Sequence, residues 1–205
     1  MKKAFGYEGY FWAIMNALCD LVEISLLFLI CSLPIVTLGA SLCATFYVIC
    51  KKVENSDQNL TRMFFHSWKT NLKQGLLLEV VCCFAFSGSI LGFVALLRSN
   101  LPDIVRYPLF SLFFLAFLFS YILFSISFML QARYDDTFIH IIRNSLIAGV
   151  RQLPSTILLL VINIVSVLFC IWCTMKYGYI CLLVIIIIFP ADCLASVMLL
   201  KIFFE

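Results

Sequence analysis

Five long apolar runs constrain this chain more than any other feature of its sequence. They cover residues 21–50, 76–97, 107–130, 153–173 and 178–200, and the only charged residues inside them are Glu23, Glu79 and Asp192. A helix rises 1.5 Å per residue, so about 20 residues cross a hydrocarbon core of about 30 Å. A membrane-spanning strand would alternate apolar and polar residues, whereas these runs are apolar on all sides, so we expect helices.

The composition shows that lipid must surround much of the chain. Of its 205 residues, 64% are hydrophobic and 12% are charged, whereas a soluble domain is about 45–50% apolar and about 25% charged. A chain of this size cannot hide that excess in one core. This excludes an ordinary cytosolic enzyme, a secreted disulfide-rich module and a disordered protein. We expect an all-α, polytopic transmembrane helix bundle, with residues 1–205 forming a single integral-membrane domain in a lipid bilayer.

The first apolar run is too long for one simple span. It contains Pro34, and proline removes a helix hydrogen bond and clashes with the preceding turn. Two arrangements remain open. One is a single long helix kinked at Pro34, which gives five crossings in total. The other is a full span over residues 11–33 and a short returning helix over residues 39–51, which gives six crossings.

Basic residues gather in two segments between the runs, residues 51–75 and 131–152. Short loops on the cytoplasmic side of a membrane carry an excess of Lys and Arg. We therefore expect both segments, and the C-terminus with Lys201, on the cytoplasmic side of the cell membrane. Lys2 and Lys3 join that side only if the first run crosses twice, which favours the returning helix.

The two histidines, His66 and His140, lie in matching contexts at an offset of 74 residues. Both follow the pattern F-x-H-x-x-(K/R)-x-x-L-x-x-G, and both lead into the next apolar run. This indicates a parallel repeat about an axis normal to the membrane. Its halves would cover about residues 11–97 and 107–173, followed by a final span over residues 178–201. The alternative is coincidence in a chain of biased composition.

Each copy of the pattern predicts an amphipathic elbow helix before a span. Such a helix lies in the interface, with its aromatic side chains at the acyl boundary and its cations toward the phosphates. The simplest interpretation is an elbow that anchors the bundle, and the sharper one is a docking surface for a cytoplasmic partner. The candidate docking residues are Phe64, His66, Trp68, Lys69, Lys73, Phe138, His140 and Arg143.

Polar side chains within or directly beside the apolar runs are functional candidates, because they are costly in lipid. Asp20 and Glu23 share a helix face, Asn163 lies at the centre of its run, and Asp192 lies deep in the last run. Together these four residues form a candidate cation or proton site. The alternative is helix–helix contact, in which Asn163 and Asp192 make interhelical hydrogen bonds of about 0.6–2 kcal/mol. Glu79 is one turn into its run and can reach the interface, so we set it aside.

Nothing in the sequence indicates an enzyme, a metal site or a cofactor. The 10 cysteines lie mostly in apolar runs, where a thiol behaves as a small apolar group. Cys170 and Cys173 have redox spacing but lie within a predicted span, and no second pair completes a zinc site. Motifs for phosphate binding or nucleophilic hydrolysis are missing. A net charge of +3 gives no basis for nucleic-acid binding.

Two segments resemble the YesL family of bacterial membrane proteins. The first is SLPIVTLGAS at residues 32–41, followed by FYV at residues 46–48 and a basic exit at Lys51. The second is FFHSWKTNLKQ at residues 64–74, which is similar to the family's F-x-x-F-K-x-N-F-K-Q segment, with Trp68 and Leu72 in place of two phenylalanines. The specific part of the resemblance covers residues 16–75.

The resemblance implies little about activity, because the family is a domain of unknown function without an active site to transfer. Its genes often neighbour genes for carbohydrate uptake and degradation, including those of ATP-binding-cassette importers. Three hypotheses follow. The chain assists carbohydrate uptake through its cytoplasmic elbows, with importer subunits as partners; it is a small cation- or proton-linked transporter or channel; or it is a structural or regulatory membrane partner.

Overall fold

The computed structural model describes residues 10–54, 59–99, 102–134, 136–151, 153–177 and 181–204. Within these residues every regular element is helical. One 3₁₀ turn, Ile35–Thr37, lies between the first two of seven α-helices, which are α1 (Tyr10–Ser32), α2 (Leu38–Val53), α3 (Leu60–Arg98), α4 (Asp103–Arg133), α5 (Phe138–Arg151), α6 (Leu153–Tyr177) and α7 (Cys181–Phe204). The predicted all-α helix bundle is confirmed.

The first apolar run forms two helices rather than one. α1 ends at Ser32, and Pro34 takes an extended conformation (φ −75°, ψ 112°) before the 3₁₀ turn. α2 then returns along α1. The evidence is an ion pair between Lys52, near the end of α2, and Asp20, in the middle of α1. The single kinked helix is therefore wrong, and the returning helix is confirmed. The number of membrane crossings stays a prediction.

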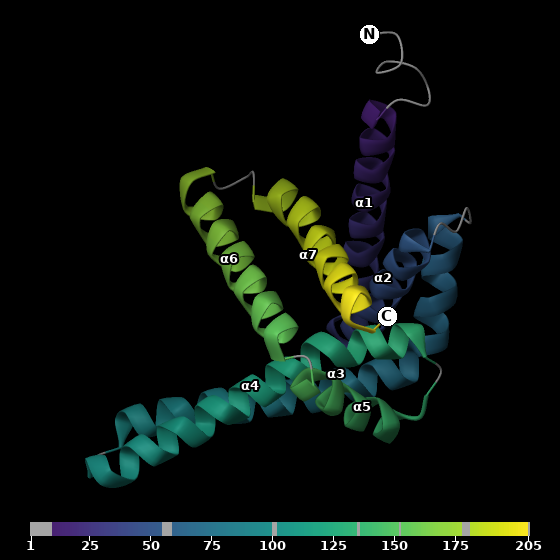
Figure 1. The fold of residues 1–205 in the computed structure, drawn as a ribbon. Coiled ribbons are helices and arrows are strands. Elements are labelled where there is room, and N and C mark those ends of the chain that lie inside the picture. The colour runs from purple at the N-terminus through teal and green to yellow at the C-terminus, as the bar shows by residue number, and fades with distance from the viewer. Residues whose placement is uncertain are drawn as a thin grey trace.

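The first predicted elbow and the span that follows it form one continuous helix, α3. Figure 1 shows the first part of α3 running beside α2, while the remainder turns away and runs along α4 toward the lower left. Gly75 lies where α3 meets the start of α2. A Cβ atom added there would lie 2.8 Å from the backbone nitrogen of Ala40. Only glycine permits so close an approach of two backbones.

The core is centred on the C-terminal half of α4. Its residues from Ile126 to Ala132 are all buried, and α2, the first part of α3 and α5 pack around them. Two polar contacts fix the amphipathic helices to this segment. Gln131 Nε2 donates to Asn71 Oδ1 of α3 over 3.4 Å, and Ser127 Oγ donates to Ser145 Oγ of α5 over 2.9 Å.

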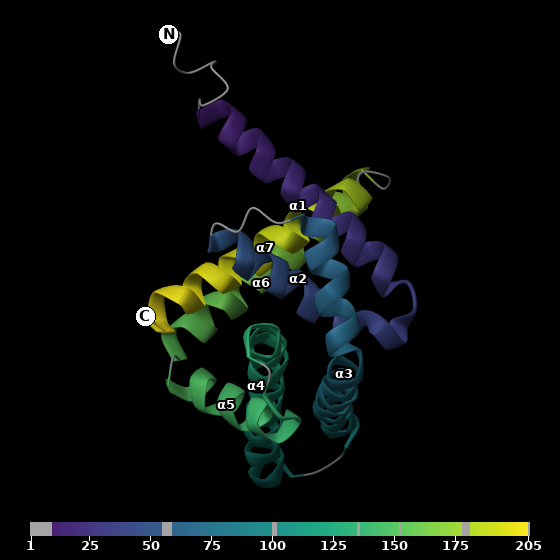
Figure 2. The ribbon, with the colours of Figure 1, turned by 90° about the vertical axis from the view of Figure 1, so that its right-hand side faces the viewer.

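The last helix packs against the first. The rings of Phe28 in α1 and Phe189 in α7 stack with centroids 4.2 Å apart. The Ser25 hydroxyl lies 2.5 Å from the carbonyl oxygen of Ile186 in α7. Figures 1 and 2 show α1 and α7 side by side, with α6 beyond α7 and the α3–α4 hairpin pointing away from them. Elements from both ends of the chain thus form one assembly.

Outside this core the helices expose large apolar side chains. In the described residues, five helical segments are long and apolar enough to cross a membrane: Met15–Ser32, Ile35–Val53, Leu60–Arg98, Asp103–Arg133 and Leu153–Cys173. A shorter apolar segment, Ile188–Leu199, lies in α7. An aqueous protein would not leave so much contiguous apolar surface uncovered. The chain is a multi-pass membrane protein.

Candidate functional site

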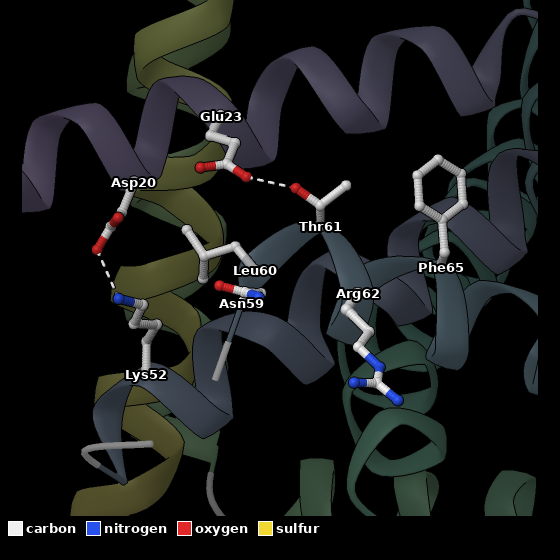
Figure 3. A pocket seen from close by; sticks show the side chains of 8 residues that line it. All are labelled: Asp20, Glu23, Lys52, Asn59, Leu60, Thr61, Arg62 and Phe65. Atoms are coloured by element: carbon white, nitrogen blue, oxygen red, sulfur yellow. Dashed lines mark hydrogen bonds and ion pairs between the residues drawn. The ribbon is translucent and has the colours of Figure 1, made fainter. Parts of the chain in front are cut away.

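An open pocket of about 550 Å³ lies between α1 and the facing ends of α2 and α3 (Figure 3). α1 contributes two acids to it, α2 contributes a lysine near its C-terminus, and α3 contributes its first turns. The lining residues are Asp20, Glu23, Lys52, Asn59, Leu60, Thr61, Arg62 and Phe65. Two carboxylates and two cations balance one another in this pocket, which makes it a mixed polar site in a largely apolar protein.

The first contact in this pocket is an ion pair between Lys52 Nζ and Asp20 Oδ2, which are 2.8 Å apart. Their side chains are 37% and 34% exposed, so solvent screens the pair, and such pairs contribute about 0–1 kcal/mol. The pair brings a cation from the end of α2 to the mouth of the pocket. It also explains how Asp20 is accommodated in an apolar helix.

The second contact joins Glu23 to the start of α3. Thr61 Oγ1 donates a hydrogen bond of 2.7 Å to Glu23 Oε1 (Figure 3). Asn59, the N-cap residue of α3, makes no capping bond with its side chain, and the first turn of α3 contains no acid. The positive end of a helix dipole favours a nearby carboxylate. Glu23 therefore supplies from α1 the negative charge that the start of α3 lacks.

Arg62 and Phe65 complete the wall of the pocket on α3. Within the described residues Arg62 forms no ion pair, and Figure 3 shows its guanidinium group pointing away from Glu23. The Phe65 ring is 39% exposed. The pocket thus combines carboxylate acceptors, ammonium, guanidinium and amide donors, and an accessible aromatic ring. Such a set can bind a neutral solute that carries several hydroxyl groups.

Asn163 lies apart from this pocket, in a groove between α4 and α6. Its Nδ2 atom donates to Tyr121 Oη over 3.1 Å and to the Leu159 carbonyl oxygen over 2.9 Å. The groove has a volume of about 480 Å³ and is otherwise apolar. Asn163 therefore joins α6 to α4 through its bond to Tyr121.

Asp192 connects α7 to α6. Ser166 Oγ donates a hydrogen bond of 2.9 Å to Asp192 Oδ1. Ser166 follows Asn163 by about one helical turn, so both polar contacts lie along α6. The four candidate residues are distributed over separate places. Asp20 and Glu23 line one pocket, whereas Asn163 of α6 contacts α4 and Asp192 of α7 contacts α6.

The candidate docking residues divide into a packed set and an exposed set. Phe64 is fully buried, and Trp68 and Phe138 pack against the same core. The prediction that the aromatic side chains of these helices face the acyl boundary is therefore wrong for Phe64, because protein covers that ring. The exposed set is polar and consists of His66, Lys69, Lys73, His140 and Arg143.

Sequence reasoning missed the structural role of Glu79. The backbone nitrogen of Gly39 donates a hydrogen bond of 2.9 Å to Glu79 Oε2, so a side chain of α3 caps the start of α2. A signal was present, because Glu79 follows Gly75 by four residues and shares its helix face. Lys52 and Thr61 were also missed as pocket residues, and no local pattern distinguishes them.

In the comparisons with known proteins, one family model matches this part of the chain. Residues 21–93 match the family model described as "Protein of unknown function, DUF624". No match is found among curated proteins or among solved structures. The matched segment runs from α1 through most of α3, and it contains every pocket residue except Asp20. The resemblance to the YesL family, which carries this domain, is confirmed.

Proposed function

We propose that this chain, which carries the DUF624 domain of the YesL family, assists carbohydrate uptake as a non-enzymatic protein of the cell membrane. The observation that supports this function is the open polar pocket between α1, α2 and α3. In small-molecule sites a few placed polar groups fix the orientation of the ligand. A pocket with balanced charges and an accessible ring suits a neutral, hydroxyl-rich solute better than a single ion.

Each group in the pocket has a role in this proposal. Glu23 accepts hydrogen bonds from sugar hydroxyls, and Arg62 and Asn59 donate hydrogen bonds to sugar oxygens. The apolar face of a sugar ring packs on Phe65. Asp20 and Lys52 hold the α1–α2 pair closed beside the ligand.

The test measures saccharide binding to the full chain in lipid nanodiscs. A panel of mono- and disaccharides is titrated into the wild type, Glu23→Gln and Arg62→Gln. Hydrogen bonds to charged groups are worth about 1.5–3 kcal/mol, so each substitution should weaken binding by about ten-fold or more. Arg98→Gln, at the far end of α3, is the matched control and should bind like the wild type. Absence of saccharide binding by the wild type, or equal binding by all variants, would refute the proposed ligand.

The exposed polar faces of the amphipathic helices are the proposed partner surface. Phe64, Trp68 and Phe138 pack on the core, and Lys69, Lys73 and Arg143 remain accessible. We place this surface in the cytoplasm together with residues 51–75 and 131–152 and the C-terminus. Subunits of an ATP-binding-cassette importer are the proposed partners.

Co-purification in mild detergent tests this partnership. The wild type should retain an importer ATPase or permease subunit, and the double variant Lys69→Glu, Lys73→Glu should lose it. Lys176→Glu, at the end of α6, reverses one charge elsewhere and should retain the partner. If no ATPase or permease subunit accompanies the wild type, the importer partnership is wrong and a structural or regulatory role takes its place.

Cation- or proton-linked transport is a second candidate function, and the contact between Asp192 and Ser166 favours it. This contact involves a carboxylate within the apolar segment Ile188–Leu199 of α7, and intramembrane acids commonly mark ion pathways. Flux of protons or cations into liposomes should be present for the wild type and lost in Asp192→Asn. Asp103→Asn, an exposed acid in the first turn of α4, is the control. A wild type without flux excludes this candidate.

A further inference from the structure

The outer face of α5 exposes large aliphatic side chains around an arginine. Ile139 is 75% exposed, Ile147 is 54% exposed and Val150 is 52% exposed. These three residues and the exposed Arg143 follow one another at spacings of four, four and three residues, so they form one row along the helix. We propose that this row lies in the headgroup region of the bilayer and is a binding site for anionic phospholipid. The inference does not depend on the proposed function.

α5 is too short to cross the membrane and is held beside it. Its 14 residues give a length of about 21 Å, whereas a hydrocarbon core is about 30 Å thick. It connects α4 to α6, and both of these helices contain segments long and apolar enough to cross a membrane. Figures 1 and 2 show α5 running across the direction of α6 rather than along it. A short helix between two spans lies where those spans leave the bilayer.

The inner face of α5 is already covered by protein. Ser145 is buried and accepts the hydrogen bond from Ser127 of α4. Gly149 is buried as well, and a Cβ atom there would lie 2.2 Å from Cγ2 of Ile122 in α4. The exposed row is therefore a separate surface on the other side of the helix. Cations and large aliphatic side chains on the free side of an amphipathic helix are typical of binding in a lipid interface.

The charge of α5 complements an anionic membrane surface. The helix carries Arg143 and Arg151 and no acid, and neither arginine forms an ion pair within the described residues. Asp135 and Asp136 precede the helix, where its dipole favours negative charge. The side chain of Arg143 can keep its stem among the aliphatic groups and carry its guanidinium to a lipid phosphate. Two uncompensated cations favour a phospholipid with net negative charge.

The matching helix at the start of α3 presents a different surface. Its Phe64 side chain is buried in the core. Between Arg62 and Lys73 its exposed side chains are polar except for Phe65, which lines the pocket. This part of α3 therefore offers charge without an aliphatic row. Lipid binding belongs to α5, and it takes Arg143 out of the proposed partner surface.

Quenching by brominated lipids tests both parts of the proposal. Ile147→Trp and Val150→Trp each place a tryptophan in the row, and the signal of the wild type, which contains 3 tryptophans, is subtracted. Each full-length protein is placed in vesicles of phosphatidylcholine. The same minor fraction of the lipid is replaced by brominated phosphatidylcholine or by brominated phosphatidylglycerol. The measurements are repeated with the double substitution Arg143→Gln, Arg151→Gln added to each tryptophan variant.

We expect brominated phosphatidylglycerol to quench the added tryptophan at least about two-fold more than brominated phosphatidylcholine, since each arginine near an anionic surface contributes about five-fold in affinity. With Arg143→Gln, Arg151→Gln, the two lipids should quench equally. The matched control is Lys69→Gln, Lys73→Gln, which removes two charges from α3 and should keep the preference.

Three results would overturn the proposal. Equal quenching by the two lipids when both arginines are present would exclude an anionic lipid site. Absence of quenching by either lipid at both tryptophans would place water or protein over the row. Loss of the preference in the α3 control would mean that only the net charge of the protein attracts the lipid. Circular dichroism confirms that the helices are intact, and the two tryptophan positions report independently.

Discussion

Single glycines decide how closely the helices of this protein approach. Gly39 and Gly75 lie against each other where α2 and α3 meet, and a Cβ atom on Gly39 would lie 2.3 Å from the carbonyl oxygen of Gly75. The obstacle is backbone, which cannot rotate away as a side chain could. Gly88 lies on α3, as Gly75 does, and a Cβ atom on Gly88 would meet nothing within 4 Å.

This contrast predicts opposite outcomes for the same substitution on α3. Gly75→Ala forces the helices apart and should destabilise the protein by about 1–3 kcal/mol, as overpacking does. Gly88→Ala should be neutral or should stabilise the helix by up to about 1 kcal/mol, because alanine has the higher helix propensity. Unfolding in mixed detergent micelles, followed by circular dichroism, measures both. Equal stability of the two variants would contradict the close contact.

At the scale of elements, the amphipathic part of α3 is a packing helix. Phe64 is fully buried against the core, whereas the neighbouring Phe65 is 39% exposed at the rim of the pocket. Asn71 fixes the same helix to the buried half of α4 through Gln131. The face that the sequence assigns to lipid is therefore used to hold α2, α3 and α4 together.

Adjacent phenylalanines test this role. Phe64→Ala should cost about 3–5 kcal/mol of stability, the usual range for removing a buried ring. Phe65→Ala should cost less than about 1 kcal/mol, because surface substitutions rarely cost more. The measurement is again unfolding in mixed micelles. A cost below about 1 kcal/mol for Phe64→Ala as well would mean that protein does not cover the Phe64 ring.

Local signals in the sequence predicted which segments are helical better than they predicted where one helix continues into the next. Pro34 predicted the break between α1 and α2, because the effect of proline on the backbone needs no partner. The apolar runs predicted the long membrane helices from composition alone, which likewise needs no partner. The continuity of α3 through Gly75 was not predicted, since the bend depends on the close approach of α2. The cap from Glu79 to Gly39 joins residues 40 positions apart, so the helix face that Glu79 shares with Gly75 does not identify its partner on α2.

At the scale of the whole molecule, the candidate polar residues do not gather in one place. Asp20 and Glu23 line a pocket with Lys52 and Thr61. Asn163 of α6 contacts α4, and Asp192 of α7 contacts α6. Apolar periodicity shows which helices lie in the membrane but not which faces meet. The sequence therefore marks these polar residues as exceptions in an apolar chain but cannot assign their partners.

The ion pair between Asp20 and Lys52 allows a charge-swap test of this arrangement. Asp20→Lys and Lys52→Asp should each increase hydrogen exchange in α1, because like charges then face each other. The double variant should restore protection to that of the wild type. Exposed pairs are worth about 0.2–1 kcal/mol, so changes of up to about five-fold in exchange rate are expected. Glu54→Lys, which affects a pair within α2, should leave α1 unchanged; failure of the double variant to recover would exclude the pairing.

The stacking of Phe28 on Phe189 has a consequence for how the protein is made. One partner of α1 is α7, and a ribosome releases α1 long before α7 exists. Until then Ser25 and Phe28 face lipid or a chaperone, and α1 cannot take its final place. Assembly is therefore completed only after α7 has been made, and a chain stopped before α7 should remain open and be a target for membrane proteases.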